Sequence, residues 1–216
     1  MMTTKINTLA KLTFVGLAYI YTTKLIDTLH HGIFRPIGVA GTVVGLNLLA
    51  GLVQLLFFII LYLQFVPKDK QALKIAAWLA IIGSAVGMLP KLLAMGLMFQ
   101  PQPLFFFIRH SMQISAFCTW LTVVLLLVFC LLFFFNNEFR RDKPQKIAFI
   151  AGAVGWFIMA AAQSLVVLNY LTGGRLVWLA DLFAPGPIVF VTTSSITFLG
   201  LSIFYLTFAR HGLERD

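Results

Sequence analysis

Among the charged and amide side chains within or at the edges of the long apolar stretches of this sequence, six are candidates for a binding site. They belong to Lys24, Asp27, Lys91, Arg109, Gln113 and Gln163. Only one of them is an acid, so a site built from them would be cationic and would favour an anion, such as a carboxylate, a phosphate headgroup or the propionates of haem. A charged side chain costs roughly 2.5–3.5 kcal/mol at the centre of a membrane helix, which makes its presence there a hypothesis of function.

The spacing of these residues places some of them on common helix faces. In a helix, Lys24, Asp27 and His31 fall at positions i, i+3 and i+7 of one face, and Arg109 and Gln113 lie one turn apart on another face. If both faces point into a helix bundle, they line a polar pocket near the outer side of a membrane. In the alternative interpretation, the long cationic side chains reach separately toward lipid headgroups, and Lys24 simply pairs with Asp27.

Two histidines offer a second kind of chemistry. His31 and His110 are expected near the outer face on different helices, where two imidazoles could ligate a b-type haem. Together with His30 and Asp27, the donor types would also suit Zn²⁺. The sequence has no HExxH or comparable ligand signature, so haem and metal binding are alternatives to the anion site.

The sequence gives little support for catalysis. It has no phosphate-binding glycine loop and no nucleophile elbow, and no paired carboxylates stand out among only seven acidic residues. Cys118 and Cys130 lie in one apolar stretch, too far apart on one helix for a mutual disulfide. We leave enzymatic activity open and favour a protein without it.

Membrane-spanning helices are the elements that must position these groups. Of the 216 residues, 60% are hydrophobic and 11% are charged, whereas about 25% of a soluble domain is charged. With spans of about 20 residues and short links, this length gives about six helices. We therefore predict an all-α fold, a polytopic transmembrane helix bundle that forms a single domain over residues 1–216. The predicted spans are residues 9–29, 37–66, 73–99, 104–135, 147–171 and 187–209.

The distribution of positive charge predicts the orientation. The net charge of +9 does not indicate nucleic-acid binding, because the cations lie in short clusters between apolar stretches. The links on one side of the predicted bundle hold Lys5, Lys68, Lys70, Lys74, Arg140, Arg141, Lys143, Lys146, Arg210 and Arg215, and those on the other side hold only Arg35 and Arg175. Because the positive side is cytoplasmic, both termini are predicted in the cytoplasm. The lack of an N-x-S/T sequon slightly favours a bacterial inner membrane.

Two pairs of glycines predict close helix packing. Gly41 with Gly45, and Gly83 with Gly87, have the GxxxG spacing that lets the backbones of two membrane helices approach each other. We expect both pairs to lie at contacts inside the bundle.

Three classes of function are compatible with these features. The first is a transporter or membrane receptor that binds a small anionic ligand or an anionic lipid headgroup in the cationic pocket. The second is a haem b- or quinone-binding subunit of a membrane redox complex. The third is a structural subunit of a larger membrane assembly. The expected partners are membrane lipids, an anionic small molecule, and membrane proteins or a second copy of the chain.

The predicted topology can be tested by labelling with a membrane-impermeant thiol reagent. In a background with Cys118→Ser and Cys130→Ser, cysteines at Gln102 and Gly174 should react from outside the cell, and cysteines at Lys70 and Lys143 should react only after the membrane is opened. Labelling of the Lys143→Cys variant in intact cells would reverse the orientation.

Overall fold

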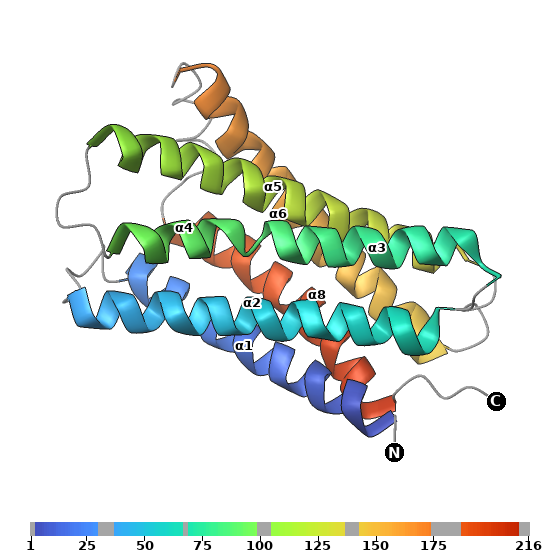
Figure 1. Cartoon of the computed structure of the whole chain (residues 1–216). Coiled ribbons are helices and arrows are strands. Elements are labelled where there is room, and N and C mark those ends of the chain that lie inside the picture. Colours follow the sequence, from blue (N-terminus) through green and yellow to red (C-terminus); the bar gives the residue numbers. More distant parts are fainter. Residues whose placement is uncertain are drawn as a thin grey trace.

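The chain is all-helical in its computed structural model (Figure 1), which describes residues 3–29, 37–66, 69–98, 105–136, 143–173 and 187–211. The helices are α1 (Thr3–Leu29), α2 (Ile37–Phe65), α3 (Gln71–Val86), α4 (Leu89–Met98), α5 (Phe105–Phe135), α6 (Lys143–Leu171) and α8 (Pro187–His211). The described residues contain no strand. The predicted all-α class is therefore confirmed.

Five stretches of the described residues are long and apolar enough to cross a membrane. They are Thr42–Gln64, Gln71–Gly96, Gln113–Phe135, Pro144–Leu171 and Thr192–Arg210. The second of them runs through both α3 and α4. Helix α1, with 27 residues, is long enough to span but less apolar. The chain is therefore a membrane protein built as a bundle of transmembrane helices.

The helices are arranged as a closed ring. Helix α1 packs on α2 and α8, α2 packs on α3 and α4, α5 joins α3 and α4 to α6, and α6 packs on α8. The start of α1 and the end of α8 lie at the same end of this ring (Figure 1), which we call the basal end. The opposite end is called the distal end.

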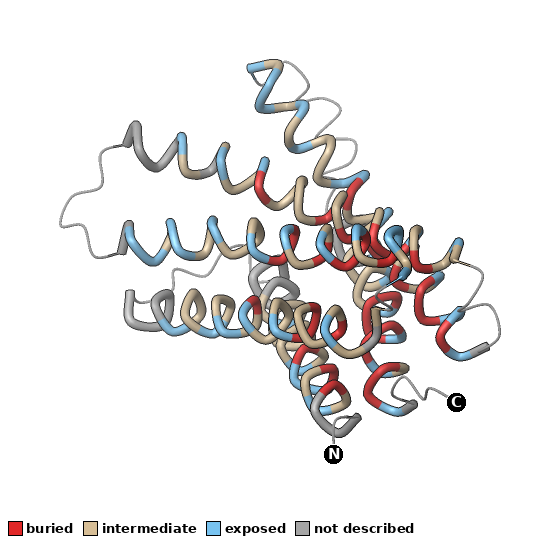
Figure 2. Tube along the Cα trace, turned by 45° about the vertical axis from the view of Figure 1, so that its right-hand side comes forward, coloured by how far each residue is buried: buried red, intermediate tan, exposed pale blue. Residues whose placement is uncertain are grey.

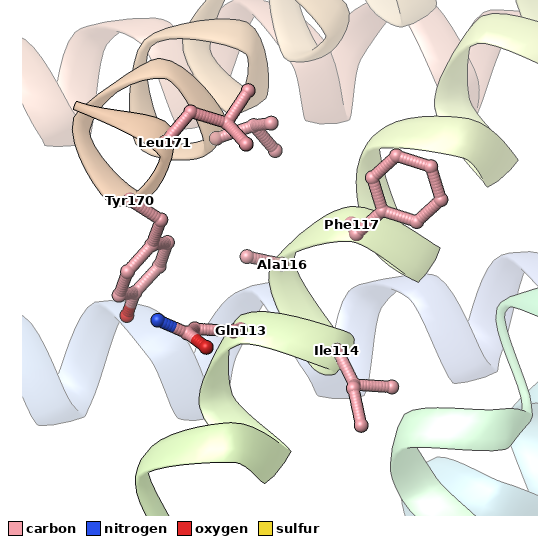
Figure 3. Close-up of a pocket in the computed structure, with 7 residues that line it drawn as sticks. Gln113, Ile114, Ala116, Phe117, Tyr170 and Leu171 are labelled. Carbon is pink, nitrogen blue, oxygen red and sulfur yellow. The ribbon is translucent and has the colours of Figure 1, made fainter. Parts of the chain in front are cut away.

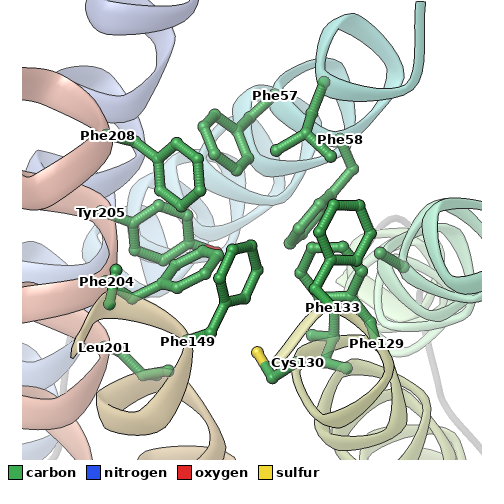
Figure 4. Close-up of a cluster of buried hydrophobic side chains, with 14 of the residues drawn as sticks. Phe57, Phe58, Phe129, Cys130, Phe133, Phe149, Leu201, Phe204, Tyr205 and Phe208 are labelled. Atoms are coloured by element: carbon green, nitrogen blue, oxygen red, sulfur yellow. The ribbon is translucent and has the colours of Figure 1, made fainter. Parts of the chain in front are cut away.

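Aromatic side chains fill the centre of the ring in its basal half. We call this group the aromatic core; it consists of Phe57, Phe58, Phe129, Phe133, Phe149, Phe204, Tyr205 and Phe208, which come from α2, α5, α6 and α8 (Figure 4). The ring centroids of Phe58 and Phe129 lie 5.1 Å apart and those of Phe149 and Phe204 lie 5.6 Å apart, in edge-to-face geometry. Such pairs add about 0.5–1.5 kcal/mol to the effect of burial alone.

Burial is confined to the basal half and the middle of the bundle. Among the described side chains none is buried in the distal parts of the helices, residues 14–23, 42–50, 85–96, 110–117, 161–173 and 192–199 (Figure 2). Of the polar side chains that the sequence places in the outer half of the membrane, Lys91, Gln113 and Gln163 lie in these parts. They are therefore held in a loosely packed region above a tightly packed one.

The third predicted span is divided into two helices. The prediction of one helix over residues 73–99 differs from the structure, in which α3 ends at Val86 and α4 begins at Leu89. The Met88 amide donates to the Ala85 carbonyl at 3.1 Å, a shorter step than in an α-helix. Pro90 explains the break, because its ring lacks an N–H and would clash with the carbonyl of Val86 in a continuous helix.

The structure places the glycines of the two GxxxG patterns differently. A Cβ atom on Gly83 would lie 3.1 Å from the Leu125 Cβ, and one on Gly87 would lie 3.0 Å from the Thr122 hydroxyl oxygen, so both glycines lie close to α5. In contrast, a Cβ on Gly45 would meet no atom of the described residues within 4 Å. The spacing predicts close contact correctly at Gly83 and Gly87 and wrongly at Gly45.

Helix α8 approaches α6 most closely at a glycine outside these patterns. A Cβ on Gly200 would lie 2.6 Å from the Ala151 carbonyl oxygen and 3.2 Å from the Gly155 nitrogen. Because these neighbours are backbone atoms, α8 would have to move to accommodate a side chain. Gly200 therefore sets the distance between the two helices.

We expect Gly200→Ala to lower the melting temperature in detergent by several degrees, because overpacking costs about 1–3 kcal/mol. Gly45→Ala is the matched control, since its methyl group meets open space and alanine favours the helix by about 1 kcal/mol. Thermal unfolding followed by circular dichroism compares the two. Equal melting temperatures for Gly200→Ala and the unmodified protein would contradict the close contact.

Candidate functional site

The structure describes only part of the predicted pocket. Lys24 and Asp27 lie in α1 and Arg109 lies in α5, but their side chains are outside the described part of the structure. His31 lies wholly outside the described residues. The polar face of α1 and the face shared by Arg109 and Gln113 therefore stay predictions.

Lys91 is directed toward α2. Its Nζ atom lies 2.9 Å from the position of a Cβ on Gly51, and the Met88 Cγ lies 3.2 Å from the same position. Gly51 is buried, and Lys91 is half-buried. Because glycine has no side chain, the ammonium group can lie directly against the backbone of α2. This placement differs from a lysine that extends along the outside of the bundle to reach headgroups.

Two amide residues of α2 share the face that Lys91 approaches. Asn47 and Gln54 lie four residues before and three residues after Gly51, so all three positions lie on one side of the helix. The Asn47 Oδ1 atom is buried and has no hydrogen-bond partner. Sequence analysis did not include Asn47 among the site residues. The sequence feature that could have identified Asn47 is the helical spacing of Asn47, Gly51 and Gln54 in a helix that has no charged residues.

Gln113 lies in a different place from Lys91. It lines an open groove of about 360 Å³ between the distal parts of α5 and α6 (Figure 3). The other lining residues are Ile114, Ala116, Phe117, Val167, Tyr170 and Leu171. Figure 3 shows the Gln113 amide and the Tyr170 hydroxyl group directed to the same end of the groove. Since the remaining lining is apolar, this groove suits a hydrocarbon chain better than a soluble anion.

Gln163 is half-buried on α6, next to a hydrogen bond that joins two helices. The Trp120 indole N–H donates to the Ser164 hydroxyl at 2.8 Å, and this hydroxyl donates to the Ala160 carbonyl at 2.8 Å. A second polar contact joins α1 to α8, where the hydroxyl oxygens of Tyr21 and Ser195 lie 2.7 Å apart. Hydrogen bonds of this kind stabilise membrane helix pairs by about 0.6–2 kcal/mol.

The haem and metal alternatives depend on residues that the structure describes incompletely. His110 is exposed on α5, and the position of His31 relative to it is not described. Within the described ranges, no three His, Cys, Asp or Glu side chains are grouped so that they could hold a metal ion. The histidine pair stays a prediction from the sequence.

Comparison with known proteins does not assign the chain to a family. No family model, curated protein or solved structure matches it. The fold defines only the class, a helical membrane protein, so a function must be argued from the side chains themselves.

The position of α4, and with it the position of Lys91, can be tested by crosslinking. In a background with Cys118→Ser and Cys130→Ser, the pair Gly51→Cys with Met88→Cys should form a disulfide on mild oxidation, because the Met88 Cβ is one bond from a Cγ that nearly touches the Gly51 position. Gly45→Cys with Met88→Cys should form none, because Gly45 has no neighbour within 4 Å. Mass spectrometry of a proteolytic digest detects the crosslink. Equal yields from the two pairs would contradict the described position of α4.

Proposed function

We propose that the chain is a membrane receptor or transporter that binds a small anionic ligand or an anionic lipid headgroup in the distal half of its helix ring. The placement of Lys91 is the observation that carries this proposal. Its ammonium group lies against buried Gly51, on the face of α2 that also carries Asn47 and Gln54, and a positive charge within a membrane bundle is costly. An anion reaching the same place would reduce that cost, and the low dielectric would strengthen the attraction.

The proposed site lies at the outer face of a six-span protein. In this arrangement α1 is the sixth span, because it closes the ring between α2 and α8. Both termini are cytoplasmic, because the predicted links at the basal end carry most of the lysine and arginine residues. The distal half is then open to the outer leaflet, and the membrane is a bacterial inner membrane.

The packing of the two halves supports entry of the ligand from the distal side. No described side chain in the distal parts of the helices is buried, whereas the aromatic core occupies the basal half. Among the described residues, a ligand that approaches Lys91 from the distal side would therefore displace no buried side chain. A transporter would need a second conformation in which the aromatic core opens, and a receptor would not. Lys24, Asp27, Arg109 and Gln163 are proposed as further contacts of the anionic group, and Gln113, in the groove between α5 and α6, as a contact of a bound lipid.

Binding of two chemically defined anions tests this function. The anionic lipid is short-chain phosphatidylglycerol, with short-chain phosphatidylcholine as its neutral comparison, and glycerol phosphate is the free headgroup. We expect Lys91→Gln to weaken binding of the phosphatidylglycerol or of the glycerol phosphate about ten- to a hundredfold, since a hydrogen bond to a charged group contributes about 1.5–3 kcal/mol. Titration calorimetry on the protein in neutral detergent measures both ligands.

Three further variants test whether binding depends on the position of the Lys91 ammonium group and not only on its positive charge. Gly51→Ala keeps Lys91 but puts a methyl carbon 2.9 Å from its Nζ, so the ammonium must move and binding should weaken. Gly45→Ala adds the same methyl group where nothing lies within 4 Å, and Lys11→Gln removes an exposed charge from α1. Both should bind normally. Unchanged affinity in Lys91→Gln, or failure of both anions to bind the unmodified protein, would overturn the proposed function.

A further inference from the structure

A small internal cavity lies where four helices meet, near the middle of the bundle. It has a volume of about 30 Å³ and is lined by Thr13, Leu17, Ile20, Ala50, Gln54, Trp156 and Tyr205, from α1, α2, α6 and α8. The proposed function does not use this cavity, which lies away from the groove between α5 and α6.

Two polar atoms at this cavity are buried and unpaired. Trp156 is 6% exposed and Tyr205 is 1% exposed, and neither the indole N–H nor the phenol oxygen has a hydrogen-bond partner among the described residues. Leaving such a group without a partner costs about 1–3 kcal/mol. In a bundle surrounded by lipid, neither group can turn toward bulk water. Something in the cavity must therefore satisfy both.

The other polar groups of the cavity restrict the occupant further. The Thr13 hydroxyl donates to the Leu9 carbonyl at 2.8 Å, so its oxygen faces the cavity as an acceptor only. Gln54 is half-buried and brings an amide that both donates and accepts. The Trp156 N–H can only donate. The occupant must accept a hydrogen bond from Trp156 and also have protons to donate.

We propose that this cavity is a binding site for internal water, which bridges the Trp156 indole N–H and the Tyr205 hydroxyl. Water both donates and accepts, and the cavity exceeds the roughly 10–15 Å³ that one molecule requires. A metal cation would face the hydrogen of the indole N–H. No cationic side chain lines the cavity to hold a bare anion.

The bridging water links the polar part of the bundle to its aromatic core. Tyr205 lines the cavity, and its ring packs against Phe57 in the core at a centroid distance of 5.4 Å. Gln54 lies on the same side of α2 as Gly51, which Lys91 approaches. The water thus joins α6 to α8 through hydrogen bonds, next to the aromatic core.

Nuclear magnetic resonance can detect this water directly. With ¹⁵N-labelled tryptophan in detergent micelles, the Trp156 indole proton should show a nuclear Overhauser cross-peak at the water frequency. Trp156→Phe assigns the signal by removing it. The Trp120 indole, which bonds directly to Ser164, is the internal reference. Absence of the Trp156 cross-peak would overturn the proposal, and so would a Trp156 chemical shift that follows chloride concentration, because the occupant would then be an anion.

The stability of Tyr205→Phe decides whether the water bridges the two side chains. If a water bridges the two side chains, the variant loses the hydrogen bond between the Tyr205 hydroxyl and that water, and the water keeps an unpaired group. The melting temperature should then fall by several degrees. In a dry cavity the variant only loses an unpaired polar group, and its melting temperature would stay the same or rise. Tyr62→Phe, at a half-buried tyrosine outside the cavity, should change little. An unchanged or raised melting temperature for Tyr205→Phe would overturn the bridging role.

Discussion

The packing of aromatic rings at the centre of a helix ring is the constraint on which this structure depends. A ring of helices in which each packs only on its neighbours leaves an axial space that none of the described helices occupies. Small side chains would not reach across it, and in lipid an empty space loses the dispersion contacts that hold helices together. Phe57, Phe129, Phe149 and Phe204 reach the axis from four different helices and meet there. The abundance of phenylalanine in the sequence has this structural use.

Glycine performs the opposite task at the perimeter of the ring. Aromatic rings keep the helices of the core apart, whereas Gly200 allows α8 to contact α6 directly. Gly16 likewise allows α1 to approach α2, since a Cβ on Gly16 would lie 2.8 Å from the Ala50 Cβ. Large residues fill the centre of the ring, and small residues between neighbouring helices allow those helices to pack closely around it. Both sets of residues lie mostly in the basal half and the middle, so the distal half can carry polar groups at lower cost to packing.

The helices were predictable from the sequence because an apolar stretch of about 20 residues has few stable forms in lipid other than a helix. The direction of each face was not, because in a membrane the outside of a helix is as apolar as its inside. Exposed Phe157 and Leu199 cannot be told by composition from buried Phe149 and Phe204. The glycine spacing likewise marked Gly83 and Gly87 correctly and failed at Gly45, since a glycine facing open space has the same spacing.

The site was foreseeable to a smaller extent. The positions of Lys91 and Gln113 along apolar stretches predict a similar depth for both, but the sequence does not predict which residues they contact. Lys91 lies against Gly51 of α2, next to the helix break that Pro90 explains, and Gln113 lines the groove between α5 and α6.

The break at Gly87 and Met88 has a mechanical consequence. Helix α3 packs closely on α5 at Gly83. Helix α4 is short and is joined to α3 by a bend in which the Met88 amide bonds to Ala85, three residues earlier, instead of four. A displacement of Lys91 would therefore change the contacts of α4 with α2 and α5 before it changed the contact of Gly83 with α5.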